Sequence, residues 1–100
     1  MNETEIHIKV INKKGVHARA AAKFVRTVGL FDVQVMVAKT AGAGVSVGGE
    51  VVEVSGSSIL GLMMLGAECS STLRLRAKGA QAEEAAVAIR KLIEDKFGEE

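Results

Sequence analysis

Three stretches of the chain carry hydrophobic residues at alternate positions, which is the pattern of a half-buried strand. In residues 5–11, Ile6, Ile8 and Val10 share one face, whereas His7 and Lys9 share the other. We therefore expect His7 to be a surface residue of a strand. The same pattern predicts strands at residues 32–37 and 71–77, and residues 50–54, which are rich in valine, are interpreted as a further strand.

Two other stretches repeat hydrophobic residues every three or four positions and predict amphipathic helices. The first helix begins just after His17 and ends near Gly29, and its apolar face holds Ala21, Phe24, Val25 and Val28. The second is longer, and its buried stripe holds Ala82, Ala85, Ala86, Ile89, Leu92 and Ile93.

A third, short helix is predicted at residues 59–66, which are apolar nearly all round. Ser58 precedes it as a residue suited to an N-cap, and Gly66 is suited to end it. A helix with no polar face cannot bury every side in a small domain, so we expect part of it to be exposed. An exposed leucine and methionine patch is typical of a docking surface.

The resulting order, β-α-β-β-α-β-α, indicates the α+β class and a two-layer open-faced sandwich, with helices on one face of a sheet. One hundred residues suit a single domain, residues 1–100. The connection at about 39–49 is long and rich in glycine. Residues 45–47 could extend the flanking strands, or the tract could be a loop. It lacks the spacing of a phosphate-binding P-loop, so we interpret it as structural.

Composition excludes several classes of function. The net charge of +1 and only three aromatic residues, all phenylalanine, argue against nucleic-acid binding. No apolar run is long enough to span a membrane, and the polar start of the chain does not resemble a signal peptide, so we expect a cytoplasmic protein. Cys69 is the only cysteine and is interpreted as a small apolar filler. No cluster predicts a metal site, and no cofactor is expected.

The candidate chemistry lies around His17, at the predicted start of the first helix. The first backbone N–H groups of a helix lack partners, and the helix dipole is positive there, so this end favours an anion such as phosphate. It also favours a neutral, nucleophilic imidazole. Arg19 could contact the same anion. Five basic residues flank His17 and would steer an acidic partner toward it: Lys13, Lys14, Arg19, Lys23 and Arg26.

The segment from Asn12 to Ala21 closely resembles the active-site segment of HPr, the phosphocarrier of the bacterial phosphoenolpyruvate:sugar phosphotransferase system. The likeness rests on Gly15, Val16, His17, Ala18, Arg19 and Ala21. Ala20 departs from it, because the family usually has proline there. The resemblance covers nearly the whole chain apart from the glycine-rich tract. It implies a four-stranded antiparallel sheet covered on one face by three helices.

The resemblance also implies a function. His17 would accept a phosphoryl group on Nδ1 from enzyme I and pass it to an enzyme II A component. The chain would then be a carrier with a phosphohistidine intermediate rather than a stand-alone turnover enzyme. Arg19 and the backbone at Ala18 and Arg19 would hold the phosphate oxygens. The expected docking surface comprises Ala18, Ala22, Arg26, Ile59, Leu60 and Met63.

Two alternatives stay open within this family. Residues 58–63 resemble the regulatory-serine helix of HPr, which implies phosphorylation of Ser58 by an HPr kinase/phosphorylase. The lead-in from Asn12 to Gly15 also occurs in the nitrogen-related branch, whose members use the same histidine to report on metabolism. A third reading, from another class, is a small-molecule-binding regulatory domain of similar shape that would need no histidine chemistry.

Overall fold

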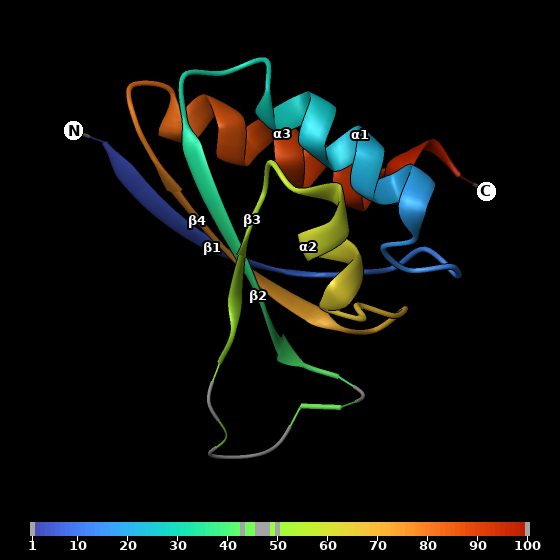
Figure 1. The fold of residues 1–100 in the computed structure, drawn as a ribbon. Helices are drawn as coiled ribbons and strands as arrows, with labels where there is room; N and C mark the ends of the chain where they lie inside the picture. Colours follow the sequence, from blue (N-terminus) through green and yellow to red (C-terminus); the bar gives the residue numbers. More distant parts are fainter. Residues whose placement is uncertain (1, 43, 46–48, 50, 100) are drawn as a thin grey trace.

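The computed structural model describes residues 2–42, 44, 45, 49 and 51–99, and their elements follow the predicted order (Figure 1). The elements are β1 (Glu3–Lys9), α1 (Ala18–Val28), β2 (Gln34–Ala41), β3 (Glu53–Ser55), α2 (Ile59–Met64), β4 (Thr72–Lys78), α3 (Ala82–Glu94) and the 3-10 turn η1 (Lys96–Gly98). The predicted fold class is confirmed: four strands form one antiparallel sheet in the order β1-β4-β2-β3.

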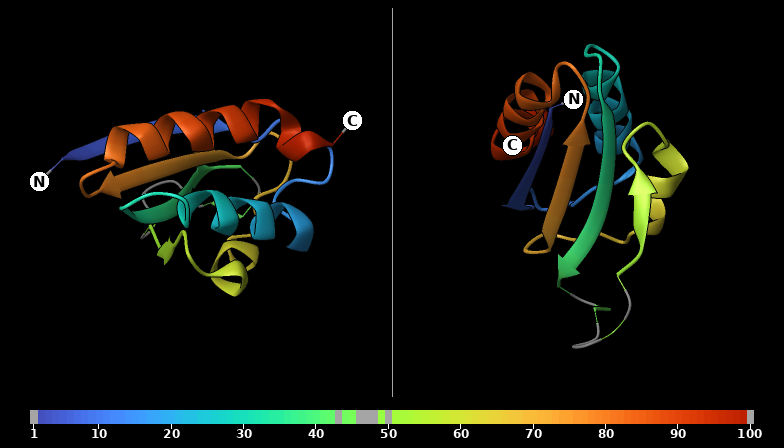
Figure 2. Two further views of the ribbon diagram at one scale, coloured as in Figure 1. Left: turned by 90° about the horizontal axis from the view of Figure 1, so that it is seen from above. Right: turned by 90° about the vertical axis from the view of Figure 1, so that its left-hand side faces the viewer.

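The helices form a single layer over one face of the sheet. Helices α3 and α1 run side by side, and α2 lies on the far side of α1, beside β3 (Figure 2). The core between the layers is built from the predicted stripes of both helices and from alternate strand positions. Its fully buried side chains include Phe24, Leu73, Leu75, Ile89 and Ile93.

The strand limits differ from the prediction in β1, β2 and β3, and β3 covers Glu53–Ser55 where residues 50–54 were predicted. β1 runs over Glu3–Lys9, although Val10 stays buried and its N–H still bonds to the Ser71 carbonyl oxygen. β2 continues to Ala41 through an irregularity near Lys39, so the start of the 39–49 tract is strand. The possible extra strand at 45–47 lies largely outside the described residues.

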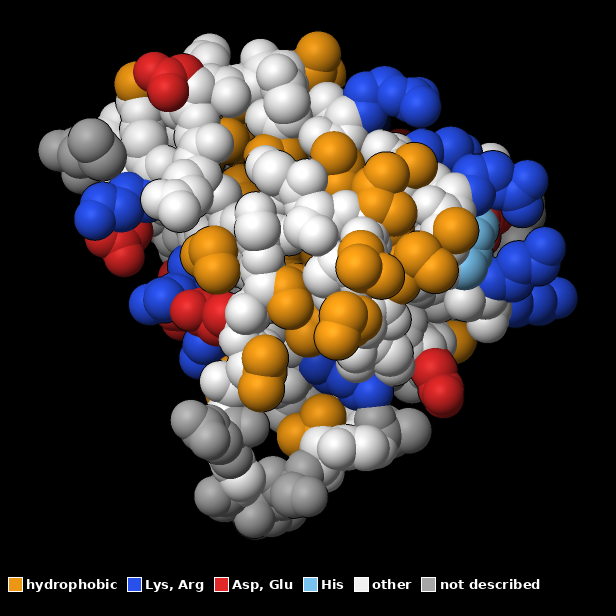
Figure 3. All heavy atoms as spheres, viewed as in Figure 1, with side chains coloured by type: hydrophobic (Ala, Val, Ile, Leu, Met, Phe, Trp, Pro, Cys, Tyr) orange, Lys and Arg blue, Asp and Glu red, His pale blue; other side chains and the backbone are white. Residues whose placement is uncertain are grey.

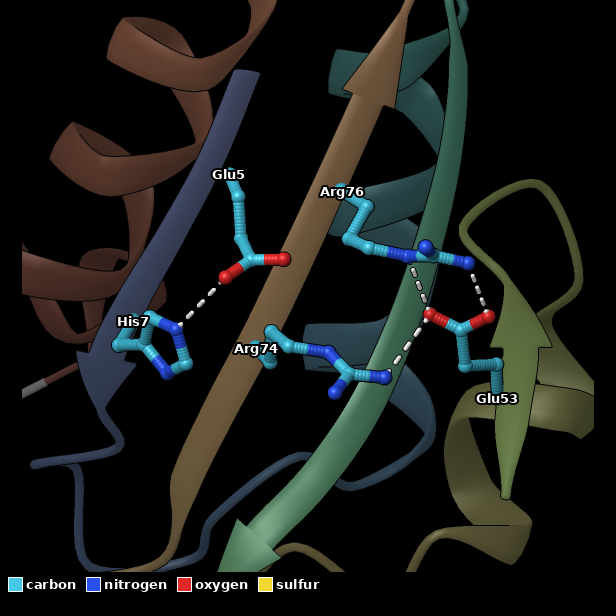
Figure 4. Close-up of polar contacts among 5 residues, drawn as sticks. All are labelled: Glu5, His7, Glu53, Arg74 and Arg76. Atoms are coloured by element: carbon cyan, nitrogen blue, oxygen red, sulfur yellow. Dashed lines mark hydrogen bonds and ion pairs between the residues drawn. The ribbon is translucent and has the colours of Figure 1, made fainter. Parts of the chain in front are cut away.

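The other face of the sheet carries a polar network that spans three strands. Glu53 on β3 accepts hydrogen bonds from Arg76 on β4 at 2.6 and 2.7 Å and from Arg74 at 3.1 Å. These side chains cross β2, which lies between β3 and β4 (Figure 4). They cross at Ala38, which pairs with both Glu53 and Arg74 and is fully buried. A small residue on the central strand thus leaves room for an ion pair between its two neighbours.

Two surface features complete the fold. His7 lies exposed on β1 beside Glu5, as the alternation predicts (Figure 4). The interpretation of Cys69 as an apolar filler is wrong, because Cys69 is exposed and fills no space in the core. In the connection between α2 and β4, Ala67 and Ser71 are buried, and the three residues between them are exposed. Over the part of the chain that is described, no helix has both the length and the apolar character to cross a membrane.

Candidate functional site

The connection between β1 and α1 is a tight turn that sets the direction of the first helix. Gly15 closes it, since its N–H bonds to the Asn12 carbonyl oxygen at 3.1 Å. Gly15 has φ of +64°, and a Cβ on it would lie 2.4 Å from the Ala67 carbonyl oxygen. The next residue, Val16, donates its N–H to that same oxygen at 2.8 Å. Only glycine fits this position without moving the backbone.

His17 is the N-cap of α1. Its backbone is extended, with φ of −82° and ψ of −179°, and its carbonyl oxygen accepts the first helical hydrogen bond, from Ala21 N–H. Its side chain folds back, so that Nδ1 accepts the Arg19 N–H at 3.2 Å. The ring is therefore held at the positive end of the helix dipole, as the sequence predicts.

Glu99 occupies the other side of the imidazole. Its Oε2 pairs with His17 Nε2, and its Oε1 accepts a hydrogen bond from Asn12 Nδ2 at 3.0 Å. Burial opposes ionisation of this carboxyl, but the hydrogen bonds from Asn12 and His17 and the nearby positive charges hold the pKa of Glu99 below its ordinary value. Glu99 is consequently an anion near neutral pH.

These partners define the tautomer of His17. A carboxylate only accepts hydrogen bonds, so the paired Nε2 carries the hydrogen. A backbone N–H only donates, so Nδ1 presents its lone pair. The neutral ring is therefore assigned as the Nε2–H form, with Nδ1 as the basic nitrogen. With 23% of its side chain exposed, His17 is accessible from solvent.

Of the other predicted site residues, Ala18 and Arg19 lie at the His17 end of α1, whereas Arg26 lies at its other end. Ala18 and Arg19 lie exposed in the first turn of α1, next to the His17 ring. Ala22 is partly buried, and Arg26 is exposed in the last turn. The first N–H groups of a helix make no i→i−4 hydrogen bond, so a helix start of this kind can bind an anion.

Ser58 is the N-cap of α2, as predicted. Its Oγ accepts the Gly61 N–H at 2.9 Å. Beside it, the predicted docking residues Ile59, Leu60 and Met63 are exposed, and Leu62 turns inward to the core. Hydrophobic side chains gather over α2 and the adjoining side of α1, with Lys and Arg at the edge of this area (Figure 3). Met64, not among the predicted docking residues, is exposed in the same helix.

The sequence predicted neither the presence of Glu99 at the site nor the role of Asn12 there. Asn12 is fully buried, and its Nδ2 also donates to the Gly15 carbonyl oxygen at 2.8 Å. It thus ties the glycine turn to the carboxylate. An asparagine before a glycine turn is a common loop feature, and Glu99 is far from His17 in the sequence, so no local pattern indicated a role for either residue.

Comparison with known proteins gives consistent matches. Residues 4–95 match the family model described as PTS HPr component phosphorylation site. The chain is 39% identical over 94 residues to the phosphocarrier protein HPr of Pseudomonas aeruginosa, covering 94% of each chain. It is 35% identical over 99 residues to the phosphocarrier protein NPr of Shewanella violacea, covering 99% of this chain and 98% of that one. The crystal structure of HPr from Thermoanaerobacter tengcongensis superposes with a TM-score of 0.80 at 39% identity, covering 97% of this chain and 98% of that one.

Proposed function

The chain belongs to the HPr family of phosphocarrier proteins of the phosphotransferase system, and on that premise we propose that His17 carries the phosphoryl group on Nδ1. The observation that carries the proposal is the basic Nδ1 of an accessible histidine at the first turn of α1. In this proposal residues 1–100 act as one domain, and the 39–49 tract is a lengthened connection. The cytoplasmic location stays a prediction from the sequence.

Phosphoryl transfer at this site requires little rearrangement. Among the described residues, the Nδ1 lone pair accepts the Arg19 N–H at 3.2 Å, near the long limit of a hydrogen bond. As phosphorus approaches Nδ1, this N–H is released and becomes a donor to a phosphate oxygen. The Arg19 side chain and the N–H groups of the first turn balance the charge of the group. Because the site is open to solvent, the next acceptor can reach the phosphorus from outside.

Family membership implies partners of the phosphotransferase system, and we assign their docking to the surface beside His17. It comprises Ala18, Ala22, Arg26, Ile59, Leu60 and Met63. The exposed apolar side chains of α2 would supply the buried centre of such a contact, and the basic residues of α1 would steer acidic partners. Enzyme I and an enzyme II A component would use this surface in turn, since both must reach the same nitrogen.

The decisive experiment is incubation with enzyme I and labelled phosphoenolpyruvate. We expect an acid-labile, base-stable label in the wild type and in His7→Ala, and none in His17→Ala. The His7 variant is the matched control, because it removes an exposed imidazole from β1, outside the site. Label that survives in His17→Ala would overturn the assignment.

A second candidate function is regulation at Ser58. The Ser58 hydroxyl lies at the start of α2 beside the exposed Ile59 and Leu60, so a phosphate there would add about two negative charges within the docking surface. The N–H groups of the first turn of α2 would tolerate it. We expect an HPr kinase to label wild type and Ser57→Ala but not Ser58→Ala. Equal labelling of Ser58→Ala would remove this candidate.

The nitrogen-related branch is the alternative setting for the same histidine chemistry, and the likeness to an NPr protein supports it. The two branches differ in the donor. Phosphorylation rates with enzyme I of the sugar system and with its nitrogen-related counterpart, measured side by side, would assign the chain to whichever donor is faster.

A further inference from the structure

After α3 the chain makes a turn of unusual conformation. Lys96, Phe97 and Gly98 have φ of 57°, 56° and 75°, so three consecutive residues are left-handed and two of them are not glycine. Residues other than glycine rarely adopt this backbone conformation. Such a turn persists only where the surrounding structure holds it, and such sites often have a functional reason.

This turn is held from three sides. The Phe97 ring is fully buried in the core beneath α1 and α3. Lys23 of α1 donates from Nζ to the Phe97 carbonyl oxygen at 2.6 Å. The N–H groups of Gly98 and Glu99 bond at 3.0 Å to the carbonyl oxygens of Asp95 and Lys96. The described end of the chain therefore lies in a defined place beside the connection that leads into α1 (Figure 2).

The residue delivered by this turn is Glu99. Two donors from the β1–α1 connection converge on its carboxylate: Asn12 Nδ2 on Oε1 and His17 Nε2 on Oε2. The carboxylate is only 15% exposed, which is little for a glutamate. Residues 82 positions apart in the chain thus meet through a partly buried pair.

We propose that Glu99 is a positioning residue for phosphoryl transfer, which holds His17 in the Nε2–H tautomer so that Nδ1 stays the nucleophilic atom. The inference rests on the proposed function of His17. It does not follow from the family match, because the matched residues end at 95 and Glu99 lies outside them.

The carboxylate would also act during the reaction. The Nδ1 lone pair forms the new bond to phosphorus, the bond between phosphorus and the donor atom breaks, and its electron pair leaves with the donor. No proton moves, so the ring retains the Nε2 hydrogen and becomes positively charged. Glu99 faces that hydrogen and stabilises the imidazolium, in the way that a carboxylate orients and supports a catalytic histidine elsewhere.

The first test reads the tautomer directly by nitrogen NMR of the unphosphorylated imidazole, in a His7→Ala background so that His17 is the sole histidine. We expect the wild-type Nδ1 to show the shift of an unprotonated nitrogen and Nε2 that of a protonated one. In Glu99→Ala the two shifts should move toward each other as tautomers mix. Glu94→Ala, which removes the same charge from an exposed position of α3, should match the wild type. Identical shifts in both variants, or an Nδ1–H form in the wild type, would overturn the proposal.

The second test is the initial rate of phosphorylation by enzyme I. A hydrogen bond to a charged group corresponds to about a tenfold change in rate, so we expect about a tenfold loss in Glu99→Ala and none in Glu94→Ala. Glu99→Gln, which keeps the size and removes the charge, should also be slower than the wild type. Wild-type rates in both Glu99 variants would refute the role. The two proposals can be refuted separately. The NMR measurement needs no phosphoryl donor, so it tests the role of Glu99 in the tautomer even if His17 is not phosphorylated. A label retained in His17→Ala would refute the proposed function without changing the NMR result.

Discussion

Replacing Gly15 by alanine tests how closely the turn before His17 is packed. The change has two costs. Alanine at φ of +64° adopts a left-handed conformation, which costs about 1 kcal/mol. Its Cβ would also lie 2.4 Å from the Ala67 carbonyl oxygen and 2.8 Å from Glu68 Cα, so the backbone must separate. Overpacking of this kind adds about 2 kcal/mol. We expect the free energy of unfolding to fall by about 3 kcal/mol in total.

Gly66 offers a matched control for the conformational part. It has nearly the same φ, +63°, but nothing lies within 4 Å of a Cβ placed there. Gly66→Ala should therefore cost about 1 kcal/mol, from the left-handed conformation alone. Urea denaturation followed by circular dichroism measures both values. For a domain of this size, Gly15→Ala should also lower the melting temperature by about 15 °C.

The difference between the two variants isolates the close approach of residues 15 and 67. Equal destabilisation, within about 0.5 kcal/mol, would refute the steric argument. Gly15→Ala should in addition slow phosphorylation, because the displaced turn carries His17 and the Val16 N–H bond to Ala67. Gly66→Ala should leave the phosphorylation rate unchanged.

Three further changes have defined outcomes. Glu53→Gln should lower the free energy of unfolding at pH 7, and this deficit should shrink in acid. The hydrogen bond from Arg76, against the effect of burial, holds the pKa of Glu53 below its usual value. The stabilisation by the Glu53 carboxylate is therefore complete above about pH 4.3 and is lost as pH falls through the folded pKa. Urea titrations at pH 7 and pH 3 measure this, and a deficit independent of pH would contradict it. Ala20→Pro should keep the helicity measured by circular dichroism, since the first helical hydrogen bond of α1 is donated by the next residue; lost helicity would refute this. Cys69 should react with a thiol reagent in the native protein as readily as in urea, and protection before unfolding would contradict its exposure.

The elements with local signals were predictable from the sequence. His17 and Ser58 lie at helix starts because their side chains accept backbone N–H groups, and that chemistry is visible in the residues themselves. The alternation in residues 71–77 predicted β4 to within one residue at each end. In each case the pattern and the cause lie within a few neighbouring positions.

The features that the sequence did not predict depend on distant contacts. Glu99 reaches His17 through a left-handed turn at Lys96 and Phe97, and neither residue type favours that conformation. Cys69 was interpreted as an apolar filler from its residue type, but in this connection Ala67 is the buried residue and Cys69 is exposed. The burial of such residues depends on contacts between segments that are distant in the chain, which no local pattern reports.

The ion pair across Ala38 has a consequence for how the sheet tolerates change. Over the described residues β3 pairs with β2 at three positions, and a long glycine-rich connection separates the two strands in the chain. Glu53 also joins β3 to β4, on the other side of β2, through its hydrogen bonds with Arg74 and Arg76. The edge strand therefore has an attachment that does not pass through its hairpin. The length of this connection and the attachment of β3 to the sheet therefore become separable, so the connection could lengthen or shorten while Glu53 still joins β3 to β4.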